Sequence, residues 1–379
     1  MTLIPNVAPW NARTSLAGWL LLAAIALPAC QTQKRVPITQ APETVESGIV
    51  TADTSKMHIA LSMSFVEGSA YRQTMVKSFE QAAKIAQQQG HLADFIVLDA
   101  NGNTDRQAEQ LQQLIEAKYD AILINPNSVS ELNAKVKSAC DAGIIAIGFD
   151  NTVTEPCAYN INTIWNHYGA IQGNYLRTRL EQGNILEVRG AKGTTGDTDI
   201  SAAIQSALAQ FPNLKIVAPV RGNWTQHIAQ KEVAAILPSL PQIDAVVTQG
   251  GDGYGTALAF AATQRPMPII IMGNRYDELK WWQKQRDANG YQTISASATP
   301  GISAVAFWTA QQILAGKDVP KFLELPLLVI EAENLDTWLS MTPPDGTANA
   351  DYTLDWTVEL IDAHLERTPL PTPPIPSPP

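Results

Sequence analysis

The sequence lacks the features of several common protein classes. Its 26 Lys and Arg residues are outnumbered by 36 Asp and Glu residues, the net charge is -10, and the basic residues form no cluster. A nucleic-acid-binding surface needs clustered cations to neutralise phosphates, so DNA and RNA are excluded as partners. The five histidines lack the spacing of a metal site, and no GxSxG nucleophile motif occurs. We therefore expect a protein that is not an enzyme and that carries no metal and no cofactor.

Long hydrophobic runs are scarce, and the one near the N-terminus is typical of an export signal. Arg13 precedes an almost wholly apolar stretch, 16–27, which is too short to span a bilayer comfortably as a permanent helix. Shortly after it, Ala29 before Cys30 resembles a bacterial lipobox. We therefore assign 1–30 to a signal peptide and expect Cys30 to be lipidated, with a plain cleaved signal as the alternative. Both interpretations place the protein in the periplasm or on the cell surface.

Cysteine is scarce too, with three in the whole chain. If Cys30 takes the lipid, Cys140 and Cys157 are left as an even pair in an oxidising compartment, which favours a disulfide. In the chain-entropy description, closing a loop of this size stabilises the fold by roughly 3 kcal/mol. Two unpaired buried thiols are the alternative, because the sequence does not show whether the two Cα atoms come within reach.

The two ends of the chain lack the periodicity of folded elements. Residues 31–56 are expected to form a linker that tethers a domain to a membrane surface. The C-terminal extension, 346–379, ends in the proline-dense stretch RTPLPTPPIPSPP, which is expected to bury nothing and to form an extended tail. Recognition of this tail by a proline-binding partner is the alternative.

Between the ends, short apolar runs alternate with amphipathic segments at helical spacing, which predicts parallel sheets covered by helices. The pattern runs through four strands and then restarts, so two such units follow each other. Strands are predicted at 58–63, 95–98, 121–124, 144–149, 158–161, 185–188, 214–218, 243–247, 269–272 and 293–297. A helix at 302–314 and a strand at 325–330 would cross back between the units.

The predicted fold class is α/β, with two doubly wound parallel-sheet (Rossmann-like) domains. The N-terminal lobe is assigned to 57–162 plus 297–325, and the C-terminal lobe to 163–296 plus 326–345. Ligands of open parallel sheets bind beyond the carboxyl ends of the strands. Two such sheets are therefore expected to offer two sets of strand ends to one cleft.

The loops that follow the predicted strands carry amides, carboxylates and aromatic rings. Planar Asp, Asn, Gln and Arg side chains can each hold two hydroxyl groups, and the apolar faces of a sugar ring stack on aromatic side chains. This combination suits a sugar, although Asp and Asn in such loops also cap helices. For Asp150 with Asn151 and for Trp224 we favour a ligand contact, because an aromatic ring in a loop is poorly explained by capping.

The stretch VVTQGGDGYG, 246–255, places four glycines at the end of a predicted strand. A dinucleotide fingerprint would need GxGxxG after the first strand of its unit, and a Walker loop would need a lysine. Asp252 would also compete with a phosphate for the N–H groups that begin the next helix. The glycines instead allow the backbone to approach a small neutral ligand, with Gln249 and Asp252 as hydrogen-bonding groups. A helix cap is the alternative role for Asp252.

These motifs together resemble the periplasmic sugar-binding proteins of the ribose-binding type, the extracytoplasmic receptors of ABC importers. The resemblance covers about 57–330 and rests on IALSMSF, YDAILINPNS, AGIIAIGFDN, GAKGTTGDTD, AVVTQGGDGYG and IIIMGN in that order. It implies a monomer whose two domains, joined by a three-crossover hinge, close around a monosaccharide or polyol, with an ABC transporter permease as partner. By position, it implies ligand contacts from Ser64, Phe65, Tyr71, Arg72, Asp150, Asn151, Trp224, Gln249, Asp252 and Asn274.

The sequence departs from the family pattern at positions that bear on the ligand. Ile200 stands where relatives often have an arginine, which removes a hydroxyl clamp and argues against ribose itself, and 272–274 lacks the usual aspartate. The prediction is a protein that captures a sugar or polyol and hands it to a permease. One alternative is a ligand sensor that feeds a chemoreceptor or kinase. The other is a secreted carbohydrate-active enzyme, which would need two carboxylates converging on one bond.

Overall fold

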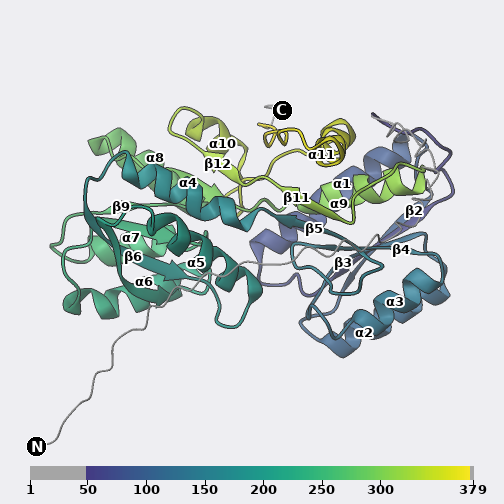
Figure 1. The fold of residues 1–379 in the computed structure, drawn as a ribbon, viewed down its shortest axis with the longest axis horizontal. Helices are drawn as coiled ribbons and strands as arrows, with labels where there is room; N and C mark the ends of the chain where they lie inside the picture. Colours follow the sequence, from purple (N-terminus) through teal and green to yellow (C-terminus); the bar gives the residue numbers. More distant parts are fainter. Residues whose placement is uncertain (1–47, 376–379) are drawn as a thin grey trace, which may run out of the picture. The chain divides into compact units, whose positions relative to one another are not determined.

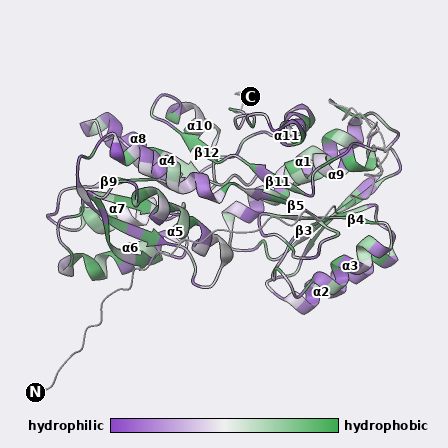
Figure 2. Ribbon diagram, viewed as in Figure 1, coloured by the Kyte–Doolittle hydropathy of each residue, from purple (hydrophilic) through white to green (hydrophobic). Residues whose placement is uncertain are grey.

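The computed structural model describes residues 48–375 (Figure 1). The predictions for the signal peptide, for Cys30, for most of the linker and for the last four residues of the tail lie outside the described residues. Within 48–375, no helix combines the length and the apolar character that a membrane span requires. Figure 2 shows that the strands are mainly hydrophobic whereas the helices carry both hydrophobic and hydrophilic residues, as expected for helices that cover sheets.

A six-stranded parallel sheet forms the centre of the N-terminal lobe. Its strands are β1 (His58–Met63), β2 (Asp94–Asp99), β3 (Ala121–Asn125), β4 (Ile145–Phe149), β5 (Tyr159–Thr163) and β11 (Phe322–Leu325), in the spatial order β11-β5-β4-β3-β1-β2. Its helices are α1 (Ala70–Gln88), α2 (Thr104–Glu116), α3 (Asn133–Asp141) and α9 (Ile302–Leu314). α1 and α9 share a hydrophobic core on one face, and α2 and α3 share another. Every residue of β3 is accordingly buried, as expected for a parallel strand covered on both sides.

A four-stranded parallel sheet forms the centre of the C-terminal lobe. Its strands are β6 (Gly183–Arg189), β7 (Leu214–Arg221), β8 (Ala245–Thr248) and β9 (Ile269–Ile270), in the order β7-β6-β8-β9. Its helices are α4 (Trp165–Arg177), α5 (Thr195–Leu208), α6 (Gln226–Ile236) with a 3-10 turn at Leu237–Ser239, α7 (Gly253–Ala261) and α8 (Tyr276–Asn289). α4 and α5 pack in one hydrophobic core, and α6 and α7 in a second.

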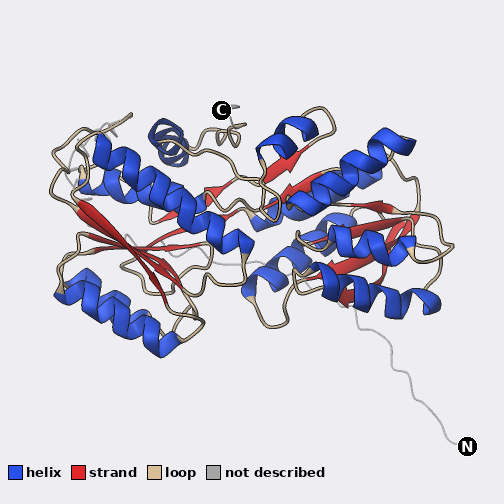
Figure 3. Ribbon diagram, turned by 180° about the vertical axis from the view of Figure 1, so that it is seen from behind, coloured by secondary structure: helices blue, strands red, loops and turns tan. Residues whose placement is uncertain are grey.

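Each lobe has a parallel sheet with helices on both faces, which confirms the predicted doubly wound fold class (Figure 3). The chain passes between the lobes three times. It crosses after β5, after β10 (Ser295–Ser297), and between β11 and β12 (Leu328–Ile330). The single strand predicted at 325–330 is wrong: β11 pairs in parallel with β5, whereas β12 pairs antiparallel with β10. Pro326 lies between them, and proline has no N–H to continue a ladder.

After β12, the chain adds α10 (Leu335–Met341) to the C-terminal lobe, and the C-terminal extension adds α11 (Leu354–Glu366) to the N-terminal lobe. Trp338 of α10 is buried in the same core as Trp282 of α8, and α11 packs beside α9. The expectation that the proline-rich tail buries nothing is wrong for its described part. The Trp356 indole N–H donates to the Thr372 carbonyl at 2.9 Å, and Leu370 packs against the core, because α11 gives the tail an aromatic surface to cover.

Residues 48–50, within the predicted linker at 31–56, are bonded to the N-terminal lobe. The Gly48 N–H donates to Asp362 Oδ2 at 2.7 Å, and the Val50 N–H donates to Gln312 Oε1 at 2.9 Å. Asp362 also forms an ion pair with Lys317, with 2.6 Å between Oδ1 and Nζ. This pair joins α11 to the loop after α9 at the point where the described chain begins.

Cys140 in α3 and Cys157 before β5 form a disulfide with their Cα atoms 6.3 Å apart. Of the two alternatives that the sequence left open, the structure contains the bonded one. The disulfide lies beside the hydrophobic core that α2 and α3 share. It fastens α3 to the segment that leads into β5.

Candidate ligand-binding site at the strand carboxyl ends

The predicted site residues stand just beyond the carboxyl ends of strands in both lobes. Ser64 and Phe65 follow β1, Asp150 and Asn151 follow β4, Trp224 follows β7, Gln249 and Asp252 follow β8, and Asn274 follows β9. Tyr71 and Arg72 belong to the first turn of α1. The carboxyl ends of parallel strands share one edge of their sheet, so each lobe gathers its share of these residues at that edge.

Asp150 is the centre of the cluster in the N-terminal lobe. Its Oδ1 accepts a hydrogen bond from the Tyr71 hydroxyl at 3.2 Å, and its Oδ2 accepts one from Asn125 Nδ2 at 3.2 Å. Burial raises the pKa of Asp150, and the charge of Arg72 opposes this shift. Burial also raises the pKa of Tyr71 well above its usual value, so the phenol keeps its proton. Two donors thus fix the orientation of a carboxyl group that can accept from a ligand hydroxyl.

Arg72 and Phe65 form a cation–π pair beside this cluster. The guanidinium carbon lies 4.1 Å from the centroid of the ring, and 39% of Phe65 remains exposed. The Oγ of Ser69 accepts from the Arg72 N–H at 3.3 Å and caps α1, which sets the first turn and the direction of Tyr71 and Arg72. An aromatic ring and a guanidinium are therefore available at the same sheet edge.

Ser64 and Asn151 are held by the protein itself. Ser64 is buried, and its Oγ donates to Asn125 Oδ1 at 2.7 Å. Asn125 is thereby oriented for its own bond to Asp150. The Asn151 N–H donates to the Phe149 carbonyl at 2.7 Å, so the backbone turns sharply immediately after β4. Ser64 acts on the carboxyl group through Asn125, whereas the half-buried Asn151 side chain has no such commitment in the described contacts.

Trp224 lies on bare backbone at the edge of the C-terminal lobe. A Cβ on Gly190, the residue after β6, would be 2.2 Å from the indole Cζ2, so no other residue fits beneath the ring. Asn223 and Trp224 have φ angles of 54° and 55°, in the left-handed region. The Trp224 carbonyl accepts from Arg275 Nη2 at 2.8 Å.

Asp252 is fully buried, and neither of its carboxyl oxygens has a hydrogen-bond partner among the described residues. The N–H groups of Thr225 and Trp224 lie near this carboxyl group without reaching hydrogen-bond geometry. Burial and then the neighbouring Glu278 raise the pKa of Asp252 well above its usual value. Asp252 stands at the N-cap position of α7, but its side chain makes no capping bond, so the capping alternative is wrong. A buried carboxyl group without a partner can serve a ligand.

Glu278 is the second buried carboxyl group of this lobe. Its Oε1 accepts from the N–H groups of Gly253 at 2.8 Å and Gly273 at 2.9 Å, which ties the start of α7 to the end of β9. Burial, followed by the charge of Asp277, raises the pKa of Glu278 to about 6. Glu278 therefore organises the backbone behind Asp252.

The two predicted amides of this lobe are committed to backbone groups. Gln249 accepts from the Gly190 N–H at 3.0 Å and donates to the Asp197 carbonyl at 3.0 Å. Asn274 Nδ2 donates to the carbonyls of Ala298 at 3.2 Å and Ala348 at 3.0 Å. Gln249 therefore joins the ends of β6 and β8, and Asn274 joins the end of β9 to a crossover and to the C-terminal extension.

Sequence reasoning missed Arg189 and Arg221, the last residues of β6 and β7. Arg189 binds Asp197 with Nε at 3.0 Å and Nη2 at 2.9 Å, and Arg221 Nη1 reaches the same carboxylate at 3.0 Å. Although burial opposes ionisation, these two arginines lower the pKa of Asp197. The available signal was a basic residue at the end of each of two neighbouring apolar strands.

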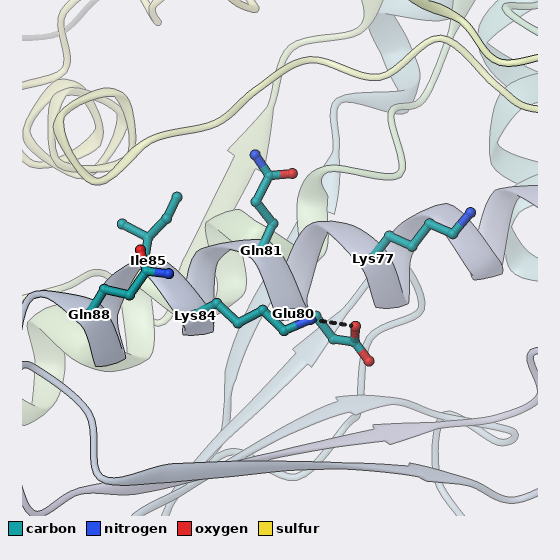
Figure 4. Close-up of a pocket in the computed structure, with 6 residues that line it drawn as sticks. All are labelled: Lys77, Glu80, Gln81, Lys84, Ile85 and Gln88. Atoms are coloured by element: carbon teal, nitrogen blue, oxygen red, sulfur yellow. Dashed lines mark hydrogen bonds and ion pairs between the residues drawn. The ribbon is translucent and has the colours of Figure 1, made fainter.

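A shallow hollow of about 440 Å³ lies on the outer surface of α1 and contains none of the predicted site residues (Figure 4). Long polar side chains line it, and Lys84 and Glu80 form an exposed ion pair across one helical turn at 3.3 Å. No aromatic ring faces this hollow. Within residues 48–375, no group of His, Cys, Asp and Glu side chains is placed to hold a metal ion.

Comparison with known proteins gives consistent matches along most of the chain. A family model described as a periplasmic binding protein domain matches residues 59–318. The xylitol-binding protein of Mycolicibacterium smegmatis is 28% identical over 272 residues, which cover 70% of this chain and 76% of the relative. The D-ribose/D-allose-binding protein of Pseudomonas aeruginosa is 29% identical over 281 residues, which cover 70% of this chain and 81% of the relative.

A solved structure supports the same assignment. The ABC transporter solute binding protein from Thermobispora bispora superimposes with a TM-score of 0.74 at 34% identity, covering 85% of this chain and 99% of that chain. A solute binding protein from Bacillus halodurans, solved with bound myo-inositol, shares the fold at 20% identity with a TM-score of 0.64. The chain therefore belongs to the periplasmic binding protein family, within its ribose-binding type.

Proposed function

We propose that this protein captures a monosaccharide or related polyol between the strand ends of its two lobes and delivers it to the permease of an ABC importer. The observation that carries the proposal is the pairing of a carboxyl group with an aromatic residue at the strand ends of each lobe: Asp150 and Phe65, both beside Arg72, and Asp252 near Trp224. A sugar offers hydroxyl groups at its rim and apolar C–H faces, and such pairs can serve both. Capture of this kind makes and breaks no covalent bond.

We divide the ten predicted contacts according to whether their polar atoms already bond to protein groups. We assign direct ligand contacts to Phe65, Tyr71, Arg72, Asp150, Asn151, Trp224 and Asp252. We assign Ser64, Gln249 and Asn274 to holding the loops, since their hydrogen bonds go to protein groups. Asp252 is expected to donate its proton to a ligand oxygen, because burial raises its pKa and favours the neutral carboxyl group.

The ligands named for the relatives support the class of ligand. Xylitol, D-ribose, D-allose and myo-inositol appear in the names of the similar proteins, and each carries several neighbouring hydroxyl groups. Closure of the two lobes would let each supply half of the hydrogen bonds and exclude water. The ligand-sensing alternative would use the same site and differ in the partner that receives the closed form.

The proposal includes an extracytoplasmic location, with lipidation at Cys30 as the membrane anchor, and a monomeric protein. It also keeps the predicted lobe boundaries at 162, 296 and 325. The disulfide between Cys140 and Cys157 supports the location, because such bonds persist in oxidising compartments.

A binding experiment tests the proposal. We expect the chain from residue 31 onward to bind at least one of xylitol, D-ribose, D-allose and myo-inositol in isothermal titration calorimetry. The variants Asp150→Ala and Trp224→Ala are each expected to weaken binding by about tenfold or more, since each removes a contact worth more than about 1.4 kcal/mol.

Two variants serve as matched controls for these substitutions. Asp336→Ala removes an exposed carboxylate that pairs with Arg286, and Trp281→Ala removes an indole that packs on Tyr291 of the same lobe. Both are expected to keep the affinity of the unchanged protein. Absence of binding across a broad panel of sugars and polyols, or full affinity in both site variants, would contradict the proposed function.

A further inference from the structure

The turn that carries Trp224 is strained. Asn223 and Trp224 are consecutive non-glycine residues in the left-handed region, which L side chains seldom adopt. The N–H groups of Gly222 and Asn223 both donate to the Arg189 carbonyl, at 2.9 and 3.1 Å, and fold the turn over the end of β6. Backbone strain persists only where the surroundings fix it, and it gathers at ligand sites. The contacts that hold this turn in its strained conformation therefore bear on ligand binding.

Arg275 holds this turn from the other side. Its Nη2 donates to the Trp224 carbonyl at 2.8 Å across 51 positions of the sequence. Its guanidinium rests on the glycine-rich loop after β8, where a Cβ on Gly251 would be 3.0 Å from Nε and 3.1 Å from Nη2. Arg275 follows β9, so one side chain connects the loops that follow β7, β8 and β9.

The charge of Arg275 is directed at protein groups. Asp252, Asp277 and Glu278 all lie near its guanidinium, which opposes the rise in pKa that burial causes in each of them. A planar guanidinium can bond a carbonyl with one nitrogen while its delocalised charge balances several carboxyl groups, which a compact ammonium does less well. These contacts with protein groups account for an arginine at position 275. A direct contact with a neutral ligand would account for it less well.

We propose that Arg275 is a positioning residue for ligand recognition: it holds the Asn223–Trp224 turn so that the indole rests on Gly190 and presents its other face to the bound sugar or polyol. The inference rests on the proposed function, because the sugar is the ligand that this ring would meet. Arg275 follows the segment 272–274, which lacks the family's usual aspartate. Its effect on ligand affinity passes through Trp224.

Two measurements on the same variants test this role. The tryptophans can be labelled with 5-fluorotryptophan, and the fluorine signal of Trp224 can be assigned from its loss in Trp224→Phe. Arg275→Met is expected to move this signal in the absence of any ligand. It is also expected to weaken the tightest-binding compound among xylitol, D-ribose, D-allose and myo-inositol by about tenfold. Arg275→Lys, which can still donate to the carbonyl, is expected to retain part of that affinity.

A double-mutant cycle separates positioning from direct contact. In the Trp224→Ala background, Arg275→Met is expected to cause no further loss of affinity, because its effect passes through the ring. Losses that multiply would mean that Arg275 contacts the ligand itself, and they would overturn the proposal.

Arg265→Met is the matched control, because Arg265, like Arg275, donates to backbone carbonyls of this lobe. Its two acceptors are Pro241 at 2.7 Å and Leu240 at 2.8 Å. This variant is expected to leave the Trp224 signal and the affinities unchanged. If no compound binds the unchanged protein, the proposed function fails, and the fluorine signal still decides whether Arg275 holds the turn. A Trp224 signal that stays in place in Arg275→Met overturns the positioning role in either case.

Discussion

Two glycines at the site leave no room for any other residue. Gly190 lies under the Trp224 ring, and a Cβ on Gly222 would be 2.8 Å from the carboxyl carbon of Asp252. The aromatic and acidic groups of the C-terminal lobe are thus packed onto bare backbone. Their positions depend on the absence of side chains beneath them as much as on the contacts they make.

Gly190→Ala tests this packing. The added methyl group would meet the indole, so either the ring or the strand end must move. We expect a loss of stability of about 1–3 kcal/mol from overpacking, measured by urea unfolding, together with weaker ligand binding. Gly196→Ala is the control, because a Cβ on Gly196 has no atom within 4 Å. Equal behaviour of the two variants would contradict the placement of Trp224 on Gly190.

Glu278 makes the stability depend on pH. Burial and then Asp277 raise its pKa from 4.5 to about 6 in the folded protein, so the folded state holds this proton more tightly than the unfolded chain. The Glu278 contribution therefore favours folding fully below about pH 4.5 and is lost as the pH rises through about 6, a change of about 2 kcal/mol.

The measurement is the free energy of unfolding of the unchanged protein and of Glu278→Gln between pH 4 and 7. Carboxyl groups remote from Glu278 cancel in the difference between the two proteins, whereas the coupled groups Asp252 and Asp277 are part of the measured effect. We expect this difference to shift against the unchanged protein as the pH rises through that window. A difference that does not vary with pH would show that Glu278 titrates alike in the folded and unfolded states.

Among single residues, the sequence predicted those whose chemistry is unusual for a loop. Trp224 stood out because a strand-to-helix loop does not need an aromatic ring, and Asp150 because it follows a buried strand. The sequence could not show that the side chains of Gln249 and Asn274 bond to backbone groups, since these bonds depend on which strand ends lie side by side. Arg189 and Arg221 were missed for the same reason, because their common partner, Asp197, lies in α5, the helix between the two strands.

At the scale of elements, alternating apolar and amphipathic segments predicted most strands and helices. The helix at 302–314 coincides with α9, since its apolar residues and its position after the crossover leave little ambiguity. The strand at 325–330 was misread because an apolar run does not reveal that its halves join different sheets on either side of Pro326. The C-terminal extension was also misread, because its packing depends on a surface that α9 and β11 create together.

The ion pair between Lys317 and Asp362 tests how firmly this extension is attached. The Lys317 side chain is 1% exposed and the Asp362 side chain 16%, so Asp362→Asn would replace a carboxylate that faces a buried ammonium. Breaking such a pair costs about 3–5 kcal/mol, which we expect to see in urea unfolding. Asp141→Asn is the matched control, because the pair between Asp141 and Lys137 is exposed on α3, where solvent screens it, and its loss should leave the stability nearly unchanged. Similar losses in both variants would argue against a firmly attached extension.

At the scale of the whole molecule, the order of the elements was enough to predict two parallel sheets with crossovers between them. Parallel strands need covering helices on both faces, and right-handed crossovers leave few topologies for such a sequence. The sequence did not predict how each lobe holds its polar groups. Asp150 is fixed by two donors, whereas Asp252 has none among the described residues. This asymmetry suggests that the C-terminal lobe depends more on the ligand to satisfy its buried carboxyl group.

The central claim is that one sugar or polyol is held between the strand ends of both lobes. The most direct test is a crystal structure of the protein with the compound that binds most tightly in calorimetry. The account predicts ligand density within hydrogen-bonding distance of Asp150 and Asp252, stacked on Trp224. Density confined to another surface, such as the hollow along α1, or contact with only one lobe in a closed structure, would contradict it.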